Sequence, residues 1–174
     1  MALRRLRLDQ VWLMVSPGNP LKPASGMAPF AERLASARRI ADGRRIVATD
    51  IEAQLGQRYT VDTLRALQRR FPRVLFVWLM GADNLAGLPG WKRWMDIAHR
   101  VPFAVVPRPT YNHRALAGQA ARRLGPSRHP ATASITLANS RAPAWTFLPG
   151  PQSAISATAL RAAVAAAPPR GAGR

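Results

Sequence analysis

Residues 74–80 read VLFVWLM, from Val74 to Met80, and run directly into GADN at residues 81–84. Seven consecutive apolar residues, rich in β-branched and aromatic side chains, have the length of a strand and are too few to span a membrane. A strand without polar residues on either face is typical of a parallel sheet covered by helices on both sides. The stretch therefore predicts a buried parallel strand that ends in a polar loop beginning with glycine.

Shorter apolar runs alternate with amphipathic segments on both sides of this strand. We predict strands at 11–15, 45–50, 102–106 and 145–148, and helices at 29–41, from Thr60 or Asp62 to Arg70, at 91–98, 116–124 and 156–166. Either Thr60 or Asp62 is expected to cap its helix, and residues 125–144 to be loosely structured. The alternation predicts an α/β fold, a Rossmann-like parallel sheet with flanking helices. It forms one domain over residues 1–167, followed by a flexible tail at 168–174.

Composition narrows the class of protein. The 174 residues include no cysteine, which excludes disulfides and cysteine nucleophiles, and the apolar run at 11–15 is too short for a signal peptide. We therefore expect a cytoplasmic protein with no membrane partner. The net charge of +18 comes almost entirely from arginine. It indicates either a nucleic-acid binder or the arginine, alanine and proline bias of a GC-rich genome. We prefer the second reading because the arginines are scattered along the chain.

Ligands of an open parallel sheet bind beyond the carboxyl ends of its strands. This rule selects four polar loops, at residues 16–22, 81–84, 107–109 and just before the last predicted helix. In the second loop, Asp83 suits either ribose hydroxyls and amines or an ordinary helix cap. Ser156, Thr158 and Arg161 form either a phosphate site at a helix N-terminus or a plain cap with a surface arginine.

The tryptophan and histidine side chains indicate a functional site less clearly than the polar loops do. Trp91 follows a glycine, and its indole either stacks on a flat ligand ring or packs in the core with Trp94. The three histidines show no metal or catalytic-triad spacing, so we interpret them as structural or surface residues: His99, His113 and His129. The sequence also contains no phosphate-binding loop of the GxxxxGK[ST] type and no GxGxxG pattern.

Eight segments carry a family likeness. They are SPGNPLK at 16–22, ERL at 32–34, DIE at 50–52, YTVDTL at 59–64, FVWLMGADNL at 76–85, LPGWKRW at 88–94, VPRP at 106–109 and ISATALR at 155–161. Together they resemble the nicotinate-nucleotide adenylyltransferases of the nucleotidyltransferase superfamily, from about residue 3 to about residue 163. The last segment is similar to the superfamily signature ISxTxxR. The YT-x-x-TL pattern and the tryptophan after GADN point to the nicotinate branch.

The resemblance implies a reaction of NAD biosynthesis. ATP, with Mg²⁺, and nicotinate mononucleotide give deamido-NAD and pyrophosphate, and both substrates are the expected small-molecule partners. The resemblance assigns nicotinate mononucleotide to Asn19, Lys22, Tyr59, Thr60, Trp91 and Lys92, with the ring of Trp91 stacked on the pyridine. It assigns ATP to Asp83, Arg108, Ser156, Thr158 and Arg161. Chemistry of this kind needs positioning and charge neutralisation more than a covalent nucleophile.

One family feature is missing from the sequence. Family members begin with a strand and a GGSFNPxHxGH-type loop whose two histidines stabilise the transferring phosphate, whereas residues 2–9 resemble the end of the helix that follows that loop. The catalytic residues are therefore unknown. The resemblance places the missing strand between the strands at 11–15 and 74–80. We expect a misassigned start codon or a truncated, inactive relative, and little or no adenylyl transfer by residues 1–174 alone.

Three alternatives stay open at this stage. The chain could be an adenylyltransferase for nicotinamide mononucleotide or phosphopantetheine, which the YT and tryptophan pattern disfavours. It could be a non-catalytic, basic nucleic-acid-binding relative, which predicts a contiguous arginine patch and strongly salt-dependent binding. It could also be a compositionally biased remnant without a stable fold. The sequence does not decide whether the chain forms a homo-oligomer.

Overall fold

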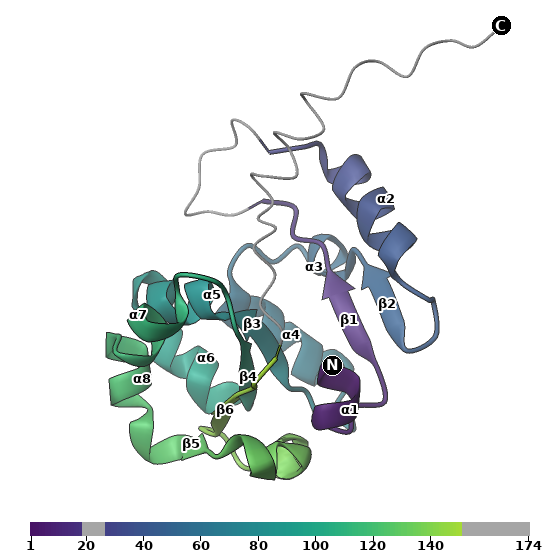
Figure 1. The fold of residues 1–174 in the computed structure, drawn as a ribbon. Helices are drawn as coiled ribbons and strands as arrows, with labels where there is room; N and C mark the ends of the chain where they lie inside the picture. Colours follow the sequence, from purple (N-terminus) through teal and green to yellow (C-terminus); the bar gives the residue numbers. More distant parts are fainter. Residues whose placement is uncertain (19–26, 151–174) are drawn as a thin grey trace, which may run out of the picture.

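Two parallel sheets lie side by side in the computed structural model, which describes residues 1–18 and 27–150 (Figure 1). The smaller sheet pairs β1 with β2, and the larger has the strand order β3–β4–β6–β5. All four strand pairings are parallel. This arrangement, with helices around the larger sheet, confirms the predicted α/β class.

The strands are β1 (Val11–Met14), β2 (Ile46–Thr49), β3 (Trp78–Gly81), β4 (Phe103–Val106), β5 (Arg128–His129) and β6 (Trp145–Phe147). The α-helices are α1 (Ala2–Arg5), α2 (Phe30–Ile40), α3 (Ile51–Gln54), α4 (Thr60–Arg70), α5 (Ala82–Gly87), α6 (Trp94–Arg100), α7 (Asn112–Leu116) and α8 (Gln119–Arg123). The 3₁₀ helices are η1 (Leu88–Gly90), η2 (Gly125–Ser127) and η3 (Ala131–Asn139). The predicted helix at 156–166 and the predicted tail lie outside the described residues.

Helix α4 forms where the apolar spacing predicts it. Val61, Leu64 and Leu67 are buried on its inner face, and Arg69 is exposed on the outer face. The predicted cap is wrong, because Tyr59 occupies the N-cap position and no side chain caps the helix. The inner face packs against α6, where Ile97 belongs to the same apolar cluster.

Of the unbroken apolar run at residues 74–80, only the second half forms a strand. Trp78 begins β3, whereas Val74 and Leu75 are 47% and 64% exposed. The prediction of a strand over the whole run, buried on both faces, is therefore wrong. Within the described residues, β3 pairs only with β4, whose first residue, Phe103, is the register partner of Trp78, so no ladder extends over residues 74–77. The strand that is buried throughout its first three residues is β4.

The region after β4 differs from its prediction in two places. The predicted helix at 116–124 is divided at Gly118 into α7 and α8. A Cβ at Gly118 would lie 3.0 Å from the carbonyl oxygen of Arg114, so the glycine permits the close turn between them. The predicted loose excursion at 125–144 instead holds η2, β5 and η3. Leu137 of η3 is fully buried because it packs with Leu6 of the N-terminal segment.

The larger sheet is covered on both faces. On one face, Phe103 and Trp145 stack with ring centroids 5.6 Å apart, within an apolar cluster that also includes residues of α5, α7 and α8. On the other face, Ala104 packs with the cluster around Leu137. Among the described helices, none is both long and apolar enough to cross a membrane.

Candidate functional site

Strands β3 and β4 end side by side and bring two predicted site residues together. Gly81 and Val106 are register partners, so the loops that follow them start next to each other. Asp83 Oδ1 lies 3.6 Å from Arg108 Nε, which links GADN to VPRP. The Oδ1 atom is buried and receives no hydrogen bond from the described residues. The backbone N–H of Arg108 donates to Asn112 Oδ1 at 2.8 Å, which ties this loop to α7.

Gly81 is needed for this approach. A Cβ at this position would overlap Asp83 Oδ1 and lie 3.1 Å from Arg108 Nε. The glycine therefore lets the carboxylate and the guanidinium meet directly over the end of β3. Its φ of −78° is available to any residue, so the requirement is for space and not for a special backbone conformation.

A second group of predicted residues meets at the start of α4. The Lys92 ammonium lies 4.1 Å from the centre of the Tyr59 ring, within the range of a cation–π contact. It also lies 3.7 Å from Asp62 Oδ2, and Arg65 Nη1 lies 3.9 Å from the other carboxylate oxygen, Asp62 Oδ1. The lysine side chain stays 48% exposed, so a charged ligand can reach its ammonium. Sequence reasoning considered Asp62 only as a helix cap and missed its contact with Lys92.

Trp91 belongs to the same neighbourhood. Its ring lies 5.6 Å from that of Trp78 on β3, at a tilt of 56°, and its side chain is partly buried. This contact supports the packing role that the sequence left open, although part of the ring stays accessible. Thr60 begins α4 next to Tyr59. Behind it, the buried hydroxyl of Thr63 donates to Glu52 Oε1 at 2.9 Å and joins α4 to α3.

Arg33 of α2 joins the start of the first predicted ligand loop, residues 16–22, to the segment just before α2. Its guanidinium donates to the carbonyl oxygens of Ser16 at 2.7 Å, Pro17 at 3.2 Å and Ala28 at 3.0 Å. Sequence reasoning quoted this arginine only as part of the ERL motif. The five remaining predicted residues lie outside the described ranges, and their roles stay predictions: Asn19, Lys22, Ser156, Thr158 and Arg161.

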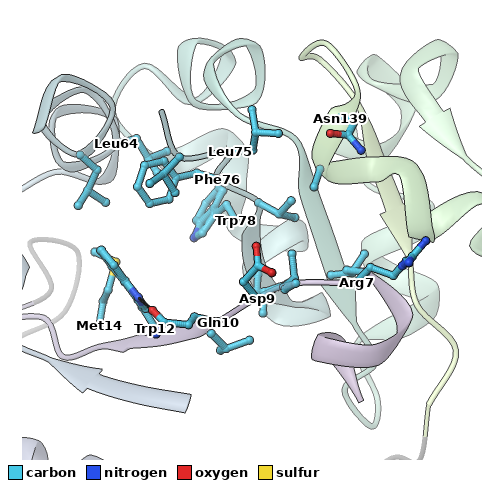
Figure 2. Close-up of a pocket in the computed structure, with 18 of the residues that line it drawn as sticks. Arg7, Asp9, Gln10, Trp12, Met14, Leu64, Leu75, Phe76, Trp78 and Asn139 are labelled. Atoms are coloured by element: carbon cyan, nitrogen blue, oxygen red, sulfur yellow. Dashed lines mark hydrogen bonds between the residues drawn. The ribbon is translucent and has the colours of Figure 1, made fainter. Parts of the chain in front are cut away.

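The cavity that stands out lies between the two sheets and not at the strand ends. It has a volume of about 930 Å³, and it is lined from one side by β1 and from the other by β3 and the segment before it. Figure 2 shows Trp12 and Met14 facing Phe76 and Trp78 across it. Thr60 is the one predicted site residue in the described ranges that lines this cavity. The prediction that Asp83, Trp91 and Arg161 share one pocket stays untested.

The histidines lie apart, as their spacing predicts. His99 is exposed on α6, His113 is exposed on α7, and His129 is partly buried in β5. In residues 1–18 and 27–150, no three histidine, aspartate or glutamate side chains gather as a metal site. Asp42 lies in the turn between α2 and β2, outside the groups of residues described above. Its pKa is lowered by the backbone N–H groups of Ile46 and Arg44, with smaller help from Arg45.

Comparison with known proteins agrees with this arrangement. A model of the cytidylyltransferase-like family matches residues 1–163. A protein of Gluconobacter oxydans is 66% identical over 160 residues, which are 92% of this chain and 82% of the relative. Proteins of Gluconacetobacter diazotrophicus and Parvibaculum lavamentivorans are 63% and 55% identical over 92% of this chain, and are covered to 75% and 80%. All three are named "probable nicotinate-nucleotide adenylyltransferase".

Proposed function

This chain belongs to the cytidylyltransferase-like family, and from that premise we propose that it acts as a nicotinate-nucleotide adenylyltransferase. The reaction joins ATP and nicotinate mononucleotide to give deamido-NAD and pyrophosphate. The observation that carries the proposal is the 66% identity, over nearly the whole chain, to a relative that bears this name. The positions of the described site residues support it.

The reaction asks for charge neutralisation and alignment. The phosphate oxygen of the mononucleotide attacks the α-phosphorus of ATP, and pyrophosphate leaves on the opposite side. Both reactants are anions, so the chain's net charge of +18 favours their approach. We propose that Mg²⁺ enters bound to the ATP phosphates, because magnesium sites commonly combine substrate phosphates with one or two carboxylates. The proposed compartment is the cytoplasm.

On the ATP side we assign Asp83 and Arg108. Their support is their place at the carboxyl ends of β3 and β4, where open parallel sheets bind ligands. The Asp83 side chain is 41% exposed, so its carboxylate can accept hydrogen bonds from ribose hydroxyls. The guanidinium of Arg108, half exposed, is free to turn toward phosphate oxygens. Motif likeness alone assigns Ser156, Thr158 and Arg161 to the phosphates.

On the nicotinate side we assign Tyr59, Thr60, Trp91 and Lys92. The Lys92 ammonium is held near Tyr59 and Asp62 but stays half exposed, which suits pairing with a pyridine carboxylate. Trp91, anchored on Trp78 by part of its ring, offers the accessible part for stacking. Asn19 and Lys22 are assigned to the same substrate by motif likeness alone. Selectivity for an acid over an amide would follow from the positive charge of Lys92.

Ligand binding tests this proposal without requiring turnover. Isothermal titration should show nicotinate mononucleotide binding about tenfold more tightly than nicotinamide mononucleotide, a difference of about 1.4 kcal/mol. Lys92→Gln should abolish this preference, whereas Arg69→Gln, on the exposed face of α4, should keep it. Equal binding of the two nucleotides by the parent chain would contradict the proposal.

A further inference from the structure

The acidic residues of the chain stop at Asp96. Residues 97–174 hold ten arginines and three histidines but no aspartate or glutamate, whereas all eight acidic residues precede them. A genomic bias toward arginine explains the many arginines but not the absence of acidic residues. Of the described arginines after Asp96, Arg108 alone lies within 4.0 Å of a described carboxylate. This part of the chain therefore carries positive charge that its own side chains do not neutralise.

Three of these arginines lie around the end of α8. Arg122 and Arg123 belong to the last turn of α8, Arg128 begins β5, and all three are exposed. Arg122 and Arg123 line one shallow hollow together with Gln119 and Pro126. We call Arg122, Arg123 and Arg128 the arginine surface.

Trp145 joins the two parts of the arginine surface. Its buried indole N–H donates to the carbonyl oxygen of Leu124, the C-cap residue of α8, at 2.7 Å. The Arg128 guanidinium lies 5.3 Å from the centre of the same ring, within the range of a cation–π contact. Because Arg128 is exposed, its N–H groups can still donate to a ligand. One buried ring thus positions both the end of α8 and the start of β5.

The arginine surface lies at the opposite end of the sheet from the proposed ATP residues. Arg128 is the register partner of Trp145, the first residue of β6, at the amino end of the strands. Asp83 and Arg108 follow the carboxyl ends of β3 and β4, and Figure 1 shows α8 and β5 lower in the view than α5 and α7. A strand of four residues, such as β4, puts about 10 Å between the two ends. Nucleotide phosphates bound beside Asp83 would therefore leave the arginine surface open.

The chemistry of the arginine surface fits a nucleic-acid backbone better than a membrane. Both ligands present many phosphates, which guanidinium groups bind through paired N–H donors. Proteins that lie on membranes also bury tryptophan, phenylalanine or leucine side chains among the lipids. In residues 112–130, which form α7, α8, η2 and β5, no large apolar side chain is exposed. Gln119, at the edge of the hollow, adds an exposed amide that also suits phosphate oxygens.

We propose that the arginine surface binds the phosphate backbone of a nucleic acid without reading its base sequence. Each contact between an arginine and a phosphate releases condensed counterions, so the affinity falls steeply as salt is added. This binding is a second property of the chain and does not depend on adenylyl transfer. It also leaves the loops at the carboxyl ends of β3 and β4 available to nucleotides.

A fluorescein-labelled DNA duplex of mixed sequence tests the proposal on the whole chain, by fluorescence anisotropy. We expect binding that weakens as the salt concentration rises from about 50 to about 200 mM. In the variant Arg122→Gln/Arg123→Gln, the plot of log K against log salt concentration should become shallower by about 2, since each lost contact removes about 0.9 from the slope. Arg38→Gln/Arg39→Gln removes the same charge from exposed positions of α2 and should leave the slope unchanged.

Two further measurements complete the test. If Arg122→Gln/Arg123→Gln does not fold, as judged by its Tm, Arg122→Gln alone should make the slope shallower by about 1. Saturating Mg–ATP or nicotinate mononucleotide should not displace the duplex from the parent chain, because the arginine surface and the proposed ATP residues lie at opposite ends of the sheet.

Four results would overturn the proposal. The first is that the parent chain does not bind the duplex. The second is an equal change of slope in the two double variants, which would make the overall net charge responsible. The third is displacement of the duplex by either nucleotide, which would place its binding at the substrate loops. The fourth is tighter binding to vesicles that contain phosphatidylserine than to the duplex, which would make a membrane the ligand.

Discussion

At the scale of single residues, the carboxylate of Asp83 and the guanidinium of Arg108 meet although 25 positions separate them in the sequence. Each was predicted as an ATP ligand from its own motif. Their contact was not predictable, because it depends on the register between β3 and β4, which no local pattern encodes. The same holds for Lys92, whose contacts with Tyr59 and Asp62 arise from the packing of α4 against its neighbours.

Gly81→Ala should weaken ATP binding with little effect on folding. The added Cβ would overlap Asp83 Oδ1 and push the carboxylate away from Arg108. We expect the Kd for Mg–ATP to rise about tenfold, equivalent to about 1.4 kcal/mol, measured by titration calorimetry. Gly87→Ala is the matched control, because a Cβ at Gly87 would meet nothing within 4 Å. A similar loss of affinity in both variants would contradict the account.

Asp42 should make the thermal stability of the fold depend on pH. Its carboxylate accepts the backbone N–H groups of Arg44, Arg45 and Ile46, each at 2.8 Å, and these bonds lower its pKa from 3.8. A carboxyl with a lowered folded-state pKa stabilises the fold above its unfolded pKa, and this contribution is lost as the pH falls through the folded value. The Tm advantage of the parent over Asp42→Asn should therefore be larger at pH 6 than at pH 3. An unchanged difference would show that the carboxylate's charge is not involved.

At the scale of elements, periodicity predicted most helices and strands, and its failures have local causes. Val74 and Leu75 look like strand residues but lie on a stretch with no partner strand in the described chain. Gly118 divides a helix that amphipathicity alone predicts as continuous. The sequence of η3 has no clear periodicity of apolar residues, so it did not predict a helix. The segment is held in place because Leu137 packs with Leu6, which is distant in the sequence.

Arg33 joins the elements that flank the first ligand loop, and the conservative variant Arg33→Lys should expose this role. The planar guanidinium of Arg33 donates to three carbonyl oxygens, which lie on both sides of residues 19–26 in the sequence. The ammonium group of a lysine cannot reach all three at once. We expect a loss of about 1–2 kcal/mol in the free energy of unfolding, measured with urea. Arg38→Lys, at an exposed position of the same helix, should cost much less. Equal losses would show that the three bonds do not hold the loop ends.

At the scale of the whole molecule, the α/β class and the family could be predicted from the sequence, but the division into two sheets could not be read from periodicity. The strand that the family resemblance implies between 11–15 and 74–80 stays a prediction; β1 and β3 both line the cavity of about 930 Å³. The polar loops at the ends of β3 and β4 lie where the strand-end rule predicts. Whether Arg161 joins them is a prediction that the described residues leave open.

Binding of the nicotinate nucleotide at the surface around Trp91 is tested most directly by NMR, through the indole N–H signals of the five tryptophans. Addition of nicotinate mononucleotide should shift the Trp91 signal, assigned through Trp91→Phe, and nicotinamide mononucleotide should shift it far less. The Trp145 signal should stay in place, because that indole is buried and donates to the carbonyl oxygen of Leu124 at 2.7 Å. An unmoved Trp91 signal, or equal shifts with both nucleotides, would contradict the account.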